Sequence, residues 1–88
     1  MNNKQIDLSK MLFRNLKHRF PELELVSITE SAENPNHIWV NIIMPDDEDR
    51  EIAIREVASE LSTNILLKYG YHITISSSSE LEKERVKL

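Results

Sequence analysis

The strongest constraint on the fold is a strand, a long helix and a second strand that follow one another over residues 38–76. IWVNIIM, residues 38–44, has apolar side chains at alternate positions, which predicts a strand. Residues 46–69 carry apolar side chains at helical spacing, and Gly70, the only glycine, falls where a helix closes in the left-handed conformation. HITIS, residues 72–76, predicts the next strand. Because such crossovers are right-handed, we expect the two strands to be parallel.

The residues before this unit predict one more helix. Its apolar positions recur every three or four residues: Leu8, Met11, Leu12, Leu16 and Phe20. We expect Asp7 or Ser9 to cap this helix and residues 1–5 to form a flexible tail. Pro21 ends the helix, because a proline disfavours helical geometry at the residue before it.

Residues 23–29, LELVSIT, predict a strand whose alternation is interrupted. Leu23 and Leu25 share one phase, whereas Val26 and Ile28 share the other. Because side chains alternate between the two faces of a strand, this change of phase indicates a bulge or a later start. The polar link over 30–37 favours an antiparallel pair with the strand that follows.

Together these elements predict a single α+β domain over residues 1–88. We expect two layers, a three-stranded mixed sheet with helices on one face, in the order α-β-β-α-β. Ser79 and Glu82 have the spacing of a capping box, so a short C-terminal helix, frayed over 79–88, is also expected.

Length and charge limit the function. The chain has 88 residues, no cysteine and a net charge of −4. No disulfide or thiolate metal site is therefore possible, and an acidic chain is a poor general ligand for nucleic acid. No apolar run is long enough to span a membrane, and the polar start lacks a signal-peptide hydrophobic region. We therefore expect a cytoplasmic protein with neither nucleic acid nor membrane as its partner.

An acidic run follows the central strand and has two interpretations. Asp46, Asp47 and Asp49, together with Glu48, lie beyond the carboxyl end of a strand, where ligands of α/β sheets gather, so they are weak candidates for magnesium. The first turn of a long helix also favours acidic residues, with Asp46 as its cap. We favour the cap and expect no metal, no cofactor and no catalytic residue.

A basic strip is predicted on the first helix. Lys10, Arg14, Lys17 and His18 fall on one side of it and could bind a phosphate or a partner. The strip is equally typical of the solvated face of any amphipathic helix. No histidine pair shows helical metal-ligand spacing.

The second face of the sheet is the stronger candidate for an interaction surface. If Ile38, Val40 and Ile42 face the helices, a second set of side chains faces away from them. This set comprises Trp39, Asn41 and Ile43, bordered by His72 and Thr74 of the last strand. Exposed apolar patches often mark association surfaces. Alternatively, the C-terminal segment covers the patch.

Residues 37–85 also resemble the later half of small, minimal-type nucleotidyltransferase-like domains. HIWVNIIM is similar to the strand that bears the metal-binding acids, and NILLKYGYHITISSSSELEKER to the helix, final strand and exit. The resemblance implies a nucleotide-handling ancestry. The glycine–serine pair that holds the phosphates is absent, and the two acids fall at His37 and Trp39, so the resemblance implies no activity.

The sequence therefore predicts a small interaction or regulatory module without enzymatic activity. We expect it to associate through the open sheet face or a sheet edge, with a protein partner or with itself as a homodimer. The alternative is an inactive nucleotide-handling protein.

Overall fold

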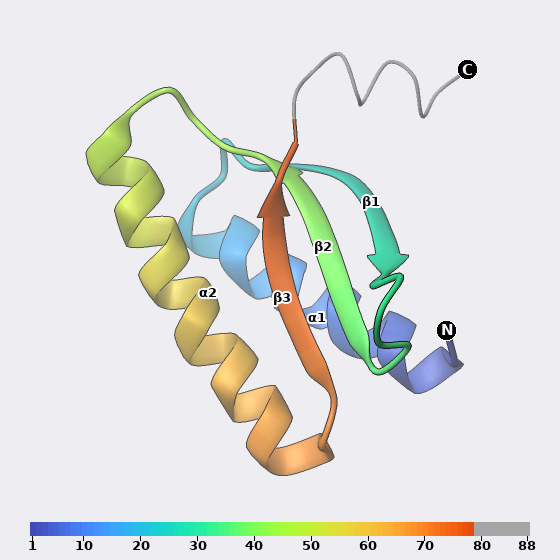
Figure 1. Cartoon of the computed structure of the whole chain (residues 1–88). Helices are drawn as coiled ribbons and strands as arrows, with labels where there is room; N and C mark the ends of the chain where they lie inside the picture. Colours follow the sequence, from blue (N-terminus) through green and yellow to red (C-terminus); the bar gives the residue numbers. More distant parts are fainter. Residues whose placement is uncertain (79–88) are drawn as a thin grey trace.

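The computed structural model describes residues 1–78 and has two helices beside a three-stranded mixed sheet (Figure 1). The elements are α1 Asn3–Arg19, β1 Glu24–Glu30, β2 His37–Ile43, α2 Glu48–Tyr69 and β3 His72–Ser77. Strand β2 is central, antiparallel to β1 and parallel to β3. The predicted α+β fold, with its order α-β-β-α-β, is confirmed. The C-terminal helix expected from Ser79 lies outside the described residues.

Helix α1 begins earlier than the sequence analysis predicted. Asn2 is its N-cap, because the Asn2 side chain accepts the Gln5 N–H at 2.8 Å and the Gln5 side chain accepts the Asn2 N–H at 2.9 Å. This reciprocal pair satisfies two donors at the helix start. Residues 3–5 are therefore the first turn of α1, not a flexible tail, and neither Asp7 nor Ser9 is the cap.

The core lies between the helices and one face of the sheet. It consists of Leu8, Leu12, Leu16, Phe20, Leu23, Ile38, Val40, Ile42, Ile54, Ala58, Ile65 and Ile73. Fully buried members such as Leu12 and Ile42 each contribute about 1.5–3 kcal/mol relative to an exposed side chain. Figure 1 shows α1 behind the strands and α2 running alongside β3, the strand at one edge of the sheet.

Strand β1 contains the expected irregularity. Leu25 pairs with Ile42 and Ser27 pairs with Asn41, so Val26 has no partner in the register. This is the β-bulge that the change of phase predicted, and it changes which side chains face the core.

Both ends of α2 follow from local chemistry. Asp47, rather than Asp46, is the N-cap, and its carboxylate accepts the N–H groups of Asp49 and Arg50. Gly70 closes the helix at φ 78°, a conformation that L side chains rarely adopt. Leu66, one of the apolar residues at helical spacing in α2, is 43% exposed. Within residues 1–78, neither helix is long and apolar enough to cross a membrane.

Candidate functional site

The outer edge of β3 carries backbone groups that no other strand of the described chain pairs with. Ser78 donates its N–H to the Ile42 carbonyl at 2.7 Å. Because alternate residues of a parallel strand bond to the same neighbour, Thr74 and Ser76 also turn their backbone groups toward β2. The residues between them turn their N–H and C=O groups outward: Ile73, Ile75 and Ser77.

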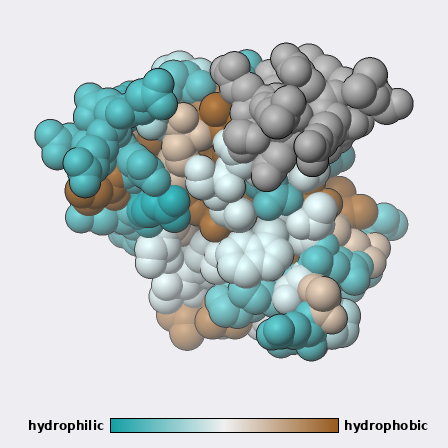
Figure 2. Space-filling model, turned by 45° about the horizontal axis from the view of Figure 1, so that its top comes forward, coloured by the Kyte–Doolittle hydropathy of each residue, from teal (hydrophilic) through white to brown (hydrophobic). Residues whose placement is uncertain are grey.

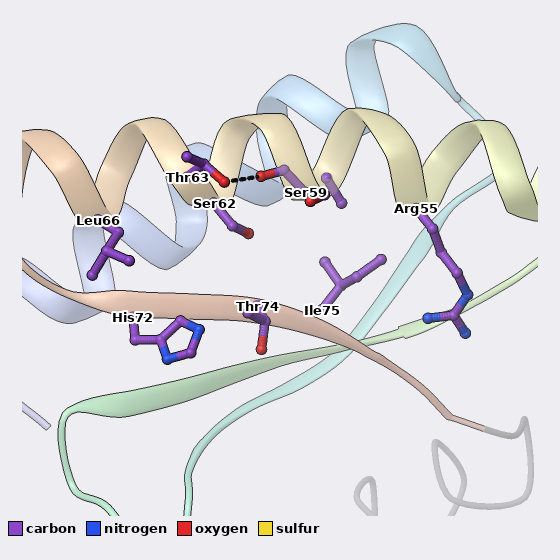
Figure 3. A pocket seen from close by; sticks show the side chains of 9 residues that line it. Arg55, Ser59, Ser62, Thr63, Leu66, His72, Thr74 and Ile75 are labelled. Atoms are coloured by element: carbon purple, nitrogen blue, oxygen red, sulfur yellow. Dashed lines mark hydrogen bonds between the residues drawn. The ribbon is translucent and has the colours of Figure 1, made fainter.

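A groove of about 240 Å³ runs between this edge and α2 (Figure 3). We call it the β3–α2 groove. Helix α2 forms one wall through Arg55, Ala58, Ser59, Ser62, Thr63 and Leu66, and β3 forms the other through His72, Thr74 and Ile75. An edge strand beside a groove can accept an added strand from another chain.

Between Arg55 and Leu66, the helix wall of the groove is built from small side chains. Ala58 and Ser62 are buried, whereas Ser59 and Thr63 are exposed. The Thr63 hydroxyl donates to the Ser59 carbonyl at 2.9 Å, as a dashed line shows in Figure 3. Such side chains leave room beside the strand that large residues would fill.

The two ends of the groove differ in chemistry. At one end Leu66 leaves 43% of its surface exposed. At the other end Arg55 is the only residue of the lining with a fixed charge. Its Nη2 and Nε lie 3.0 and 3.3 Å from the same oxygen of Glu51. Since a guanidinium has five N–H donors, this pair leaves donors for a second acceptor.

The open face of the sheet carries a cluster of rings. His37 stacks on His72 with ring centroids 4.2 Å apart and lies 4.4 Å from the Trp39 ring. His37 Nε2 is 3.0 Å from Thr74 Oγ1. Partial burial, and then the neighbouring His72, lower the pKa of His37. The in-register pairing of His37 with His72 brings these rings together.

The rest of the open face carries both polar and apolar side chains. Asn41 Nδ2 donates to Ser27 Oγ at 3.1 Å and to Thr29 Oγ1 at 3.0 Å. Trp39 and Ile43 are both half-buried. Figure 2 shows apolar side chains interspersed with polar ones over the visible surface, without one broad apolar patch. Five residues were predicted to form the interaction surface. Trp39, Asn41 and Ile43 lie on the open face alone, whereas His72 and Thr74 also line the β3–α2 groove.

Asp47 of the acidic run has a local structural role, and an ion pair lies next to the run. Asp47 caps α2, and Arg50 forms a two-point ion pair with Glu22, at 2.6 and 3.1 Å. This hydrogen bonding lowers the pKa of Glu22. Within residues 1–78, no group of three or more histidine, aspartate and glutamate side chains is placed to hold a metal ion, so Asp46, Asp47 and Asp49 gain no further ligand there.

The basic strip remains on the surface of α1. Lys10, Arg14 and His18 are exposed. Lys17 is also exposed, and its Nζ donates to the Leu23 carbonyl at 2.8 Å, which ties the helix end to the start of the sheet. Lys17 therefore has a structural role, whether or not it also binds a partner.

Comparisons with protein-family models, curated proteins and solved structures return no match for this chain.

Sequence reasoning did not identify the β3–α2 groove or His37. The groove depends on where α2 lies relative to β3, which no local pattern states. A weaker signal existed for the edge, since HITISS contains no proline and no aspartate, glutamate, lysine or arginine. The His37–His72 stack could be inferred only once the register of the parallel pair was known.

Proposed function

We propose that this protein is a small, non-catalytic interaction module that binds a partner along the edge of β3. The partner adds a strand to the sheet, in the β3–α2 groove. Backbone hydrogen bonds supply affinity in such a complex, and the groove beside the strand supplies selectivity.

The single observation that carries this proposal is the difference between the sheet's two edges. Strand β1 has a bulge after Leu25 and glutamates at both ends, Glu24 and Glu30. Charges and bulges are the usual means of preventing a sheet edge from pairing. Strand β3 has neither, its register with β2 is continuous, and a groove lies beside it. An edge left in this state is suited to pairing.

The open face supports association less well. Trp39 is already in ring contact with His37, and Asn41 already bonds to two side chains of β1. A partner on this face would meet side chains whose contacts are largely satisfied within the sheet.

Displayed random peptides selected against the protein provide the test. A synthetic copy of a selected peptide should bind Ser77→Pro about tenfold more weakly than the wild type, since one outward N–H donor is lost. Glu30→Pro is the matched control, because Glu30 is likewise the last residue of an edge strand and turns its backbone outward. Trp39→Ser controls for the open face.

Circular dichroism should first show that each variant is folded. Failure to select any peptide would count against the proposal. So would peptides that bind Ser77→Pro as tightly as the wild type, or peptides whose affinity falls only with Trp39→Ser.

A further inference from the structure

We propose that the occupant of the β3–α2 groove is a lone extended segment, with large apolar side chains at two alternate positions and a carboxylate near Arg55. This inference rests on the proposed function and adds the chemistry of the partner. Three features of the described residues carry it: the neighbours of β3, the spacing along α2 and the charge of the lining.

The neighbours of β3 argue against a second copy paired through its own β3. In each copy β3 lies between β2 on one side and the groove wall of α2 on the other. Figure 1 shows α2 running alongside the free edge. Two copies paired at these edges would each bring an α2 into the space beside the other's β3. A lone strand brings no second helix into this space.

Spacing along α2 sets the pattern of apolar side chains. Side chains two residues apart in a strand point the same way and lie about 6.6–6.8 Å apart. Ser62 and Leu66 are one helical turn apart, about 6 Å along the axis. One alternate side chain of the added strand therefore meets the small wall at Ala58 and Ser62, and the next meets the exposed surface of Leu66.

Ile75 supports an apolar side chain at the first of these positions. Ile73, two residues earlier, is fully buried, whereas Ile75 is half-buried and lines the groove. An apolar group placed between Ile75 and the small side chains of α2 would remove the remaining apolar surface from water, which is favourable.

The positive charge of Arg55 is the reason to expect a carboxylate on the bound segment. Arg55 lies at the end of the groove away from Leu66 and His72, as Figure 3 shows. Two of its N–H groups donate to one oxygen of Glu51. A ligand carboxylate can use its remaining donors, and charge-assisted bonds of this kind are the stronger ones. An acidic side chain and a free C-terminus present the same group.

The test uses peptides selected from a displayed random library against the wild-type protein. They should share two large apolar residues at alternate positions, with an acidic residue or the C-terminus on one side. Ser59→Trp fills the groove and should weaken binding of a synthetic selected peptide at least tenfold. Glu60→Trp, one residue along on the exposed surface and outside the groove lining, is its control and should leave binding unchanged.

Charge reversal tests the other end. Arg55→Glu should weaken binding about tenfold, and amidating the peptide's C-terminus distinguishes a free C-terminus from an acidic side chain. Lys68→Glu, the same change in charge on the last turn of α2, is the control.

The outcomes separate this inference from the proposed function. Peptides that require the outward edge at Ser77 but tolerate both Ser59→Trp and Arg55→Glu would overturn the inference and leave the proposed function standing. If the library yields no peptide that binds, both the inference and the proposed function are overturned. A wild-type dimer in sedimentation that becomes a monomer on Ser77→Pro would replace the lone segment with a second copy.

Discussion

The two outer strands of the sheet flank the same central strand but present different chemistry. Strand β1 is bulged and has a glutamate at each end, and the Asn41 side chain of β2 adds a hydrogen bond to Ser27 of β1. Strand β3 is regular and joins β2 through stacked rings and a histidine–threonine contact. The β1 edge has features that disfavour further pairing, whereas the β3 edge has outward backbone groups and a groove beside it. The comparison favours β3 as the edge for the proposed pairing, because the two edge strands differ in composition and regularity.

The largest expected effect comes from proline on the inner side of β3. Thr74→Pro should lower the unfolding free energy by about 1–3 kcal/mol more than Ser77→Pro, because it leaves a buried carbonyl of β2 without its donor. Urea unfolding of the two variants measures the difference. Equal losses would mean that the outward assignment of Ser77 is wrong, and the contrast between the edges would lose its basis.

A smaller effect is expected at the β1 side of the sheet. Asn41→Ala removes the two contacts to Ser27 and Thr29 and should lower the unfolding free energy by about 1 kcal/mol. Peptide binding at β3 should stay unchanged. The same urea titration checks the first expectation and an anisotropy titration the second. Loss of binding would show that the two sides are coupled through β2.

The smallest effect is a pH dependence confined to the β3 side. The pKa of His37 is lowered in the folded chain, chiefly by burial and then by His72. The unfolded chain therefore takes up the proton first. The stabilisation is complete above the unfolded pKa of about 6.5 and is lost as pH falls below it toward the folded value.

Unfolding measured between neutral pH and pH 5 should show a decline that His37→Gln reduces. His18→Gln, on the exposed surface of α1, is the control and should retain the wild-type decline. If the decline in stability is unchanged in His37→Gln, His37 is not its source.

Much of the fold was predictable because its signals are local. Alternation over 38–44, helical spacing over 46–69 and the position of Gly70 predict the crossover, and a change of phase in β1 predicts the bulge. The start of α1 was missed, although Asn2 and Gln5 have the spacing of a capping box. Apolar periodicity begins only at Leu8, so it pointed to a later start.

The candidate site was less predictable because it depends on relations between elements. Leu66 fits the apolar spacing of α2, yet it lies past the edge of the core and faces the groove. Trp39 was correctly expected on the face away from the helices. That it would contact His37 required the ring orientations, which sequence does not supply.

The tight connection after α2 has a consequence for any bound segment. Helix α2 ends at Tyr69 and β3 begins at His72, so Gly70 and Tyr71 alone join the two walls of the β3–α2 groove. This two-residue connection therefore lies at the Leu66 and His72 end of the groove. We therefore expect a segment that pairs with β3 as proposed to end or turn away near His72. If a segment binds as proposed, we expect chain ends and exposed loops to be favoured over strands held within a larger sheet.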